Sequence, residues 1–406
     1  MPLDSFRDKV LRLPVFDTHT HLNIPGVPVA AQSVWDIVHY FWFKRELVAA
    51  GYPSVPMELE EDARFRALHQ ALRFTRNTSW NWAVRQMVRD LYGMVLDSED
   101  SLRELDDAVR ASATRTGWPR EVVGRLGIDR ITVNSERDAD LPGLRGVGCA
   151  LPSQLGSSLG CRCDALLQSS SFRSELEEQV AAIRGEVAAL WARGIRGLRV
   201  DLVPYDIIGD RAYDFGTEPP AGPGDPDHVR TYLFCVLFDA MNEHGMLAQL
   251  FLGMKRKGQG DTIPVDTAYN DTGRIVRLHP LFHRYGHVRF ELVMGCELNN
   301  MDVVQAARIY PNVNPGGLWW FNFRVSSYLQ AMQYRFEALP ANRCAVLATD
   351  ARCIEWCYAK TLLVKTVLAQ FFRDQIQRGW IDAEDALWTA RWWLHDTAAC
   401  HYVSGE

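Results

Sequence analysis

The stretch Val15-Phe16-Asp17-Thr18-His19-Thr20-His21-Leu22 sets two histidines at a spacing of two behind a short apolar run. Side chains alternate across a β-strand, so Asp17, His19 and His21 are predicted to share one face, with both imidazoles at the carboxyl end. Two neutral imidazoles placed together supply half of a divalent metal site. The alternative is a strand with two polar residues hydrogen-bonded on a solvated face. The metal hypothesis is favoured because the strand is the first in the chain and a loop follows at 23–26.

Composition excludes several classes of function. The chain has 406 residues, 47% of them hydrophobic and 23% charged, which is typical of a globular protein with a large core. Its 44 basic and 50 acidic residues give a net charge of −6 without a basic cluster, so no nucleic-acid partner is expected. The first fifteen residues contain no signal-like apolar core and no later run has the length of a membrane span, so a cytoplasmic protein without a membrane partner is expected.

The nine cysteines do not form a recognisable zinc or disulfide pattern. Cys161-x-Cys163 and Cys353-x3-Cys357 each lack a second pair at zinc-finger spacing. Most of the others lie inside apolar segments, so buried free thiols are the expected state.

Short β-like runs alternate with helical patterns along most of the chain, which predicts an α/β protein. Eight strands are expected at 15–22, 127–133, 146–151, 195–202, 246–253, 288–296, 317–322 and 344–350. Eight such units predict a (β/α)8 TIM barrel that forms a single domain over 1–406. The helical pattern at 32–118 is too long for one crossover and predicts a helical subdomain inserted after the first strand, over the barrel mouth. Helices at 355–378 and 383–401 are expected to close the chain. A doubly wound open sheet is the structural alternative.

Asp350 ends the predicted eighth strand, which lies beside the first strand in a closed barrel. Its carboxylate can therefore reach a metal held by His19 and His21. An aspartate at a strand end is often the N-cap of the following helix, and this is the simpler explanation for Asp350 alone. The histidine pair at the neighbouring strand end favours a role as the third metal ligand.

Several motifs occur in an order that resembles one enzyme family. They are the first strand ending in His19-x-His21, His39-Tyr40 followed by Trp42 and Arg45, Gln249-Leu250 followed by Gly253 and Arg256, Leu318-Trp319-Trp320-Phe321-Asn322, and Thr349-Asp350-x-Arg352. The first motif resembles the amidohydrolase superfamily, and the set resembles its uronate isomerases. The resemblance extends from about Pro14 to Tyr402, although it is patchy between the motifs.

The resemblance implies an isomerase that interconverts an acidic aldose and the corresponding ketose through an enediol. His19, His21 and Asp350 would bind one divalent metal, with Zn²⁺ first and Mn²⁺ or Fe²⁺ as alternatives. Asp350 or a metal-bound water would move the proton. The remaining candidate residues are catalytic or substrate-binding and comprise His39, Tyr40, Arg352, Arg256, Trp319, Trp320 and Phe251. The substrate would be a small acid, and the family resemblance suggests a homo-oligomer.

General chemistry agrees with this assignment. An enediolate carries negative charge on two oxygens, which a metal polarises and an arginine or tyrosine donor stabilises. The planar guanidinium of Arg352 suits a carboxylate, although an arginine at a helix start can also be a plain surface residue. His39 and Tyr40 could instead belong to the aromatic packing of the first helix, and Trp319-Trp320 could mainly pack.

Two departures from the family pattern bear on the substrate. Phe251 stands where the family's fifth strand has a histidine, and Leu151–Gly156 stands where the family has an arginine-containing stretch after the third strand. Arg199, Lys255 or Arg256 could compensate for that arginine. Two other functions therefore remain open. One is a hydrolase, hydratase or decarboxylase that acts on a small carboxylic acid, aromatic acids included, through a metal-bound hydroxide. The other is a binding protein that has kept the barrel without the activity.

Overall fold

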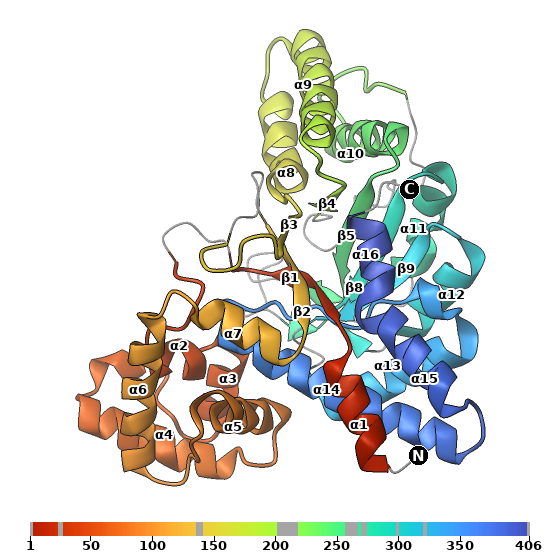
Figure 1. Ribbon diagram of the computed structural model, residues 1–406. Helices are drawn as coiled ribbons and strands as arrows, with labels where there is room; N and C mark the ends of the chain where they lie inside the picture. Colours follow the sequence, from red (N-terminus) through yellow and green to blue (C-terminus); the bar gives the residue numbers. More distant parts are fainter. Residues whose placement is uncertain are drawn as a thin grey trace.

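The computed structural model describes residues 3–22, 27–134, 141–200, 218–255, 267–268, 274–297, 300–319 and 323–403. The strands are β1 (Val15–Thr20), β2 (Ile128–Val133), β3 (Gly148–Ala150), β4 (Gly197–Val200), β5 (Leu247–Leu252), β6 (Met254–Lys255), β7 (Thr267–Ala268), β8 (Arg289–Met294) and β9 (Val313–Leu318). The protein is thus an α/β structure in which parallel strands occupy the centre and helices surround them (Figure 1).

Two parallel sheets hold the central strands. One has the order β1-β2-β3 and the other the order β4-β5-β8-β9, while β6 and β7 form a separate antiparallel pair. Backbone hydrogen bonds join the two sheets on both sides. On one side the Arg199 amide of β4 donates to the Pro152 carbonyl just after β3 at 2.9 Å. On the other side, the segment 344–350 lies between the sheets: Ala345 donates to Pro315 of β9, and Thr18 of β1 donates to Leu347.

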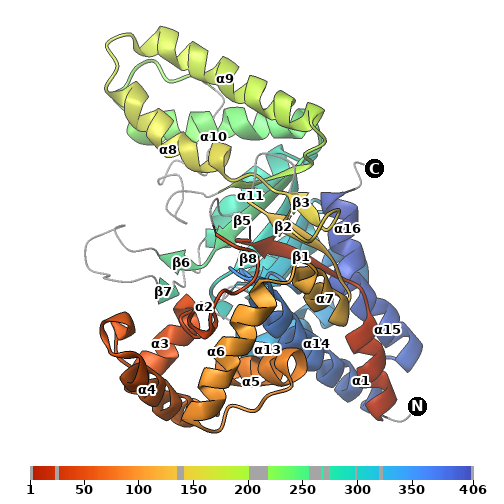
Figure 2. The same cartoon turned by 60° about the vertical axis from the view of Figure 1, so that its left-hand side comes forward.

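Helices fill the connections between the strands. They are α1 (Leu3–Arg12), α2 (Val34–Val38), α3 (Phe41–Ala49), α4 (Glu61–Phe74), α5 (Ser79–Tyr92), α6 (Glu99–Ala113), α7 (Trp118–Arg125), α8 (Gln154–Leu167), α9 (Phe172–Ala192), α10 (Pro226–Glu243), α11 (Arg274–Arg284), α12 (Asn300–Ile309), α13 (Val325–Ala338), α14 (Ile354–Gln377), α15 (Ala383–Arg391) and α16 (Thr397–Tyr402). In both overall views α2–α6 gather at one end of the molecule and α8–α10 project at another (Figures 1 and 2). No helix within the described ranges combines the length and apolarity needed to cross a bilayer.

The helical pattern predicted for 32–118 is confirmed, because α2–α6 lie within it and α7 begins at its end. Local sequence explains several of the boundaries. The Thr78 hydroxyl accepts from the Asn81 amide at the start of α5, and Gly93 ends that helix in the left-handed conformation, with φ 69°. Ser98 and Ser101 form a reciprocal capping box at the start of α6.

A register shift in β1 aims the histidines. Asp17 pairs with Ile131 of β2 and Thr20 pairs with Val133, so three steps along β1 match two along β2. One extra residue is therefore accommodated as a bulge, which reverses the alternation of side chains. The Asp17 carboxylate accepts from the Thr349 amide at 2.9 Å and from the Thr349 hydroxyl at 2.5 Å. The Asp17 carboxylate therefore bonds Thr349 and the His19 amide, whereas the imidazoles of His19 and His21 contact Asp350.

The seventh and eighth strands differ from their predicted positions. Strand β9 covers Val313–Leu318 rather than 317–322, and 320–322 lie outside the described residues. The sequence through Pro315, Gly316 and Gly317 has low strand propensity, yet a Cβ on Gly316 would meet the Glu291 side chain at 2.8 Å and one on Gly317 would collide with the Ala348 backbone. Glycine is therefore required at both positions, because neighbouring segments of the same chain approach its backbone closely. Segment 344–350 is extended but irregular, and its only bridge-type pairing within the described chain follows it, between Ala351 and Thr20.

Helix α14 is the main structural support behind this segment. It is buried along most of its 24 residues, and its indole Trp356 packs on Tyr40 and Trp80 with ring centroids 4.8 and 5.3 Å apart. Burial of each large side chain of this kind stabilises the fold by roughly 1.5–3 kcal/mol. Helix α14 therefore fixes the segment before it, 344–353, against β1 and the helices α2–α5.

Glu291 of β8 makes stability depend on pH. It is buried beside Gln249, whose amide donates to its carboxylate at 3.2 Å, and burial raises the pKa of Glu291 from 4.5 to about 7. The folded protein therefore holds a proton that the unfolded chain releases above pH 4.5. The contribution of Glu291 to the free energy of unfolding should consequently fall by about 3 kcal/mol as pH rises from 4.5 to 7. Above pH 7 this contribution should level off.

Glu291→Gln should lack this contribution. Its free energy of unfolding relative to the parent protein, measured by urea titration, should rise by about 3 kcal/mol between pH 4 and pH 8. The exposed substitution Glu177→Gln is the control and should leave the difference flat. A flat difference for Glu291→Gln would contradict the assignment.

Candidate metal centre

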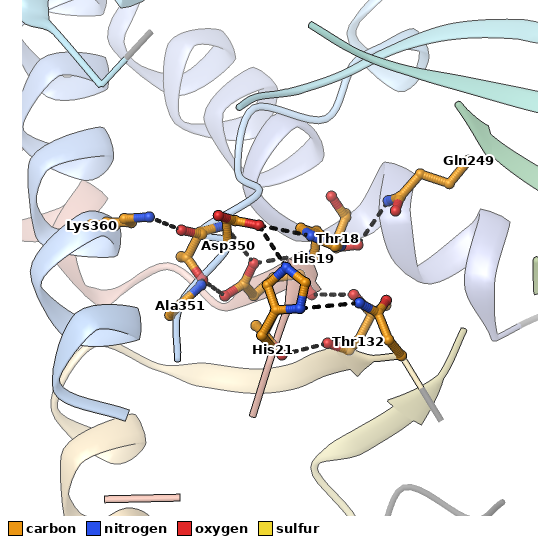
Figure 3. A network of polar contacts seen from close by, with 12 residues as sticks. Thr18, His19, His21, Thr132, Gln249, Asp350, Ala351 and Lys360 are labelled. Carbon is orange, nitrogen blue, oxygen red and sulfur yellow. Dashed lines mark hydrogen bonds and ion pairs between the residues drawn. The ribbon is translucent and has the colours of Figure 1, made fainter. Parts of the chain in front are cut away.

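His19, His21 and Asp350 meet at the carboxyl end of β1. The Nε2 atom of His19 lies 2.9 Å from Asp350 Oδ1, and Nε2 of His21 lies 3.0 Å from the same oxygen. The two imidazole rings are perpendicular, with centroids 4.9 Å apart. One ligand atom from each of the three residues lies within 4.8 Å of the others (Figure 3). The structure thus brings together the three residues that the sequence predicts as metal ligands.

The electrostatics leave the centre with neutral imidazole and ionised carboxylate. Burial lowers the pKa of His19 to about 3, so its ring is neutral at pH 7. Burial alone would raise the pKa of Asp350, but its contacts with His21 and His19 hold that pKa well below its ordinary value. The His21 Nδ1 atom faces the Asn134 amide at 3.4 Å, which fixes the orientation of this ring.

The Asp350 backbone adopts a conformation that few residues tolerate. Its φ is 53°, and it is the one non-glycine residue with positive φ in the described part of the chain. Aspartate enters this left-handed region more readily than most residues. Two backbone bonds of 2.8 Å hold the turn: Asp350 donates to His19 and His21 donates to Ala351. The turn thus places the carboxylate between the two imidazoles, at a small cost in strain.

Tyr40 and Lys360 form a buried support on the far side of Asp350. The Tyr40 hydroxyl donates to the Asp350 carbonyl at 3.0 Å and lies 3.3 Å from Oδ2. Burial, followed by the Asp350 charge, raises the pKa of Tyr40 well above 10, so the phenol stays protonated. The Lys360 ammonium donates to the Tyr40 hydroxyl at 2.8 Å and to the Thr349 carbonyl. Both sides of the Asp350 turn are therefore fixed by one lysine of α14.

The residues present fit a divalent metal. The set of two imidazole nitrogens and one carboxylate oxygen is typical of zinc and of other first-row metals. The Nδ1 atom of His19 is buried and has no hydrogen-bond partner among the described residues, and both Nε2 atoms converge on a single carboxylate oxygen. A bound cation would balance the negative charge of the buried carboxylate on which these atoms converge.

Aromatic residues form the wall beside His19. The Phe251 ring lies 4.6 Å from the His19 ring and 4.7 Å from the Trp319 ring, centroid to centroid. The Arg199 guanidinium of β4 lies 4.6 Å from the Phe251 ring, a cation–π contact. Two predicted pocket residues, Phe251 and Trp319, are thus next to the centre, and both are buried.

A cavity of 670 Å³ has Tyr40, which contacts Asp350, and Arg352 in its wall, although His19, His21 and Asp350 are not among the residues that line it. His39 also lines it, stacks on Trp35 and meets the Tyr52 hydroxyl at 2.9 Å through Nε2. Burial lowers the pKa of His39 to about 4, so this ring is neutral at pH 7. The side chain of Arg352 is exposed and has no hydrogen-bond or ion-pair partner among the described residues. The cavity therefore combines neutral polar groups, aromatic surface, two cations, Lys44 and Arg352, and the carboxylate of Asp36.

Two predicted pocket residues, Arg256 and Trp320, lie outside the described residues. Conversely, the sequence analysis missed Lys360 and Asn134, which contact Tyr40 and His21. A signal for Lys360 does exist in the sequence, because Lys360 and Lys365 interrupt an otherwise apolar helical run. Such lysines are buried only where they meet polar partners. No comparable local pattern marks Asn134.

Comparison with known proteins supports the fold. No protein-family model matches the sequence, and no curated protein matches it either. Three solved structures match almost the whole chain. A uronate isomerase from Bacillus halodurans is 16% identical, with a TM-score of 0.75, and the match covers 98% of this chain and 95% of that one. A uronate isomerase from Thermotoga maritima is 14% identical, with a TM-score of 0.76 and coverage of 98% and 97%. A glucuronate isomerase from Caulobacter crescentus is 13% identical, with a TM-score of 0.74 and coverage of 98% and 93%.

A further structure, from Lactobacillus casei, is provisionally described as a metal-dependent hydrolase. It is 15% identical, with a TM-score of 0.60, and the match covers 98% of this chain and 97% of that one. At these identities the likeness concerns the fold and not the reaction. The chain has a uronate isomerase-like fold.

Proposed function

We propose that this protein is a metal-dependent isomerase that interconverts an acidic aldose and its ketose. The observation that carries the proposal is the convergence of His19, His21 and Asp350, together with Tyr40, which contacts Asp350 and also lines the cavity that contains Arg352. The metal would be one divalent ion, Zn²⁺ in the first instance, with Mn²⁺ or Fe²⁺ as alternatives. The similarity to three uronate or glucuronate isomerases over nearly the full chain supports this choice of reaction.

The proposal includes a closed eight-stranded barrel as a single domain. The seven parallel strands and segment 344–350 would form its wall, and the bonds from Arg199 to Pro152 and from Ala345 to Pro315 support closure. Strand ends at one rim of such a barrel carry the active site. Helices α2–α6, gathered at one end of the molecule, would form the inserted subdomain over that rim (Figure 2).

Each residue has a defined task in this proposal. A bound divalent metal would polarise the substrate oxygens and stabilise enediolate charge. Asp350, whose carboxylate is ionised, would accept the proton at Oδ2 and return it to the neighbouring carbon. Tyr40 would hold the Asp350 turn through its hydroxyl, which donates to Asp350 and accepts from Lys360, and its ring would form part of the wall of the substrate cavity. Arg352 would bind the substrate carboxylate, and His39 would orient a hydroxyl as a neutral donor or acceptor.

A second function deserves a test because of the cavity wall. Apolar and aromatic side chains supply much of that wall, among them Trp35, Phe41 and Met57. Phe251 and Trp319 add aromatic surface next to His19. A small aromatic acid would suit such a surface better than a polyhydroxylated sugar would. The reaction would then be hydrolysis, hydration or decarboxylation of that acid.

Proton NMR in deuterated water separates the two functions. The metal-loaded protein is incubated with D-glucuronate and, separately, with D-galacturonate. The proposal predicts a keto acid that carries deuterium next to its carbonyl. No conversion of either hexuronate, together with turnover of aromatic acids or their esters, would contradict the isomerase and support the second function.

Arg352→Ala should weaken substrate binding in particular. Loss of a charge-assisted hydrogen bond costs about 1.5–3 kcal/mol, so KM for the acidic substrate should rise by about 10- to 100-fold. Because Arg352 is exposed, the melting temperature should change little. The exposed Arg173→Ala is the control for a lost surface charge. An unchanged KM in Arg352→Ala would exclude Arg352 as the carboxylate anchor.

A further inference from the structure

A second cavity, of 360 Å³, lies between four helices and shares no lining residue with the cavity beside the metal centre. Helices α1, α5 and α14 contribute to its wall together with α7 and Leu126, the residue that caps α7. Four arginines line it, namely Arg7, Arg12, Arg89 and Arg125. Among the described residues that line it, the acidic ones are Asp8 and Asp90. Four cations thus face two carboxylates in a chain whose net charge is −6.

Two of the arginines are already engaged. The Arg89 Nε atom lies 3.2 Å from Asp90 Oδ1, and Arg125 donates to the Asp90 carbonyl and to Glu121. The other oxygen of Asp90 accepts from the Tyr358 hydroxyl at 3.1 Å. The Asp90 carboxylate therefore bonds Arg89 and Tyr358 and does not pair with the positive charge of Arg7 or Arg12.

Arg7 and Arg12 are exposed, and neither has a hydrogen-bond or ion-pair partner in the described part of the chain. A basic residue near the end of a helix can simply complement the helix dipole. Here a different cation does so. The buried Lys365 ammonium donates to the carbonyls of Leu11, Leu13 and Leu126 at 2.6–2.8 Å, at the ends of α1 and α7. Carbonyls at the ends of both helices thus accept from Lys365 and not from Arg7 or Arg12.

We propose that this second cavity binds a small polyanion of the phosphate class, either free phosphate or a phosphorylated metabolite. Guanidinium groups form bidentate hydrogen bonds with phosphate, and Arg7 and Arg12 have donors to offer. The volume of 360 Å³ exceeds the needs of phosphate alone and leaves space for an attached organic group. Trp82 and Leu362, which also line the cavity, supply apolar surface for such a group. This site is independent of the function proposed above.

Isothermal titration of inorganic phosphate into the full chain, against sodium chloride at matched ionic strength, tests the proposal. One binding site per chain is expected. The double variant Arg7→Ala/Arg12→Ala should weaken it by at least about tenfold, because two charge-assisted contacts are lost. The control is Arg173→Ala/Arg193→Ala, which removes two exposed arginines from α9 and its end and should leave binding unchanged.

Three results would overturn the proposal: no saturable binding to the parent protein, equal weakening in both double variants, or binding lost on His21→Ala but retained in Arg7→Ala/Arg12→Ala. The last result would place phosphate at the metal centre. A parallel titration with glucose 6-phosphate separates the two sources. Tighter binding than that of phosphate supports a phosphorylated metabolite, and equal or weaker binding supports free phosphate.

Discussion

Asp350→Asn is expected to abolish metal binding while leaving the fold intact. Asparagine keeps the size of the side chain and tolerates the φ of 53° found at this position. It removes the negative charge on which both Nε2 atoms converge. Metal affinity should fall by more than about 100-fold, since loss of an outer partner of a metal ligand alone costs up to that much. Elemental analysis after gel filtration should give near one divalent ion per parent chain and almost none in the variant.

Asp350→Ala separates the carboxylate's role from that of the backbone. Alanine in the left-handed region costs about 1–2 kcal/mol, so the metal-free form of this variant should be less stable than metal-free Asp350→Asn by that amount. Metal should be absent from both. Full metal content in Asp350→Asn would show that the carboxylate is not a ligand.

Lys360→Met is expected to impair the metal centre indirectly, through Tyr40 and Thr349. The change leaves the Tyr40 hydroxyl and the Thr349 carbonyl without their donor, although methionine still packs among the surrounding rings. Stability should drop by roughly 2–6 kcal/mol, because two buried groups lose their donor and each unsatisfied buried group costs about 1–3 kcal/mol. The Asp350 turn should also loosen, which should lower metal affinity and kcat by about 10- to 100-fold.

Lys365→Met is the matched control, because it removes a second buried lysine from the same helix. Lys365 donates to three carbonyls but does not contact the metal centre, so its loss should lower stability by a similar amount. Metal affinity and kcat, measured well below the melting temperature of both variants, should change only for Lys360→Met. Partial recovery in Lys360→Arg would support the role of the cation. Equal losses of metal affinity in both methionine variants would reduce Lys360 to a purely structural residue.

The candidate site could be predicted from the sequence to the extent that it rests on local pattern and strand order. His19 and His21 are close in sequence. Their proximity to Asp350 follows because the first and last strands lie side by side. Tyr40 and Arg352 are predicted as site residues because they lie in motifs that resemble those of a known family. The structure places all of them at the centre or in the cavity beside it.

The rest depends on contacts that a single sequence does not encode locally. The register shift in β1 and the bonds from Thr349 to the Asp17 carboxylate have no sign in strand propensity. Strand β9 passes through Pro315, Gly316 and Gly317, where close packing against Glu291 and Ala348 overrides poor propensity. Lys360 sits ten residues beyond Asp350, and only the packing of α14 brings its ammonium to Tyr40.

Anomalous X-ray scattering from crystals of the metal-loaded protein tests the central claim most directly. Data collected above and below the absorption edge of the bound metal locate it without reference to activity. We expect one anomalous peak per chain, within about 2.0–2.2 Å of Nε2 of His19, Nε2 of His21 and a carboxylate oxygen of Asp350. A peak at other residues, or none in protein shown by elemental analysis to contain metal, would contradict the assignment of this centre.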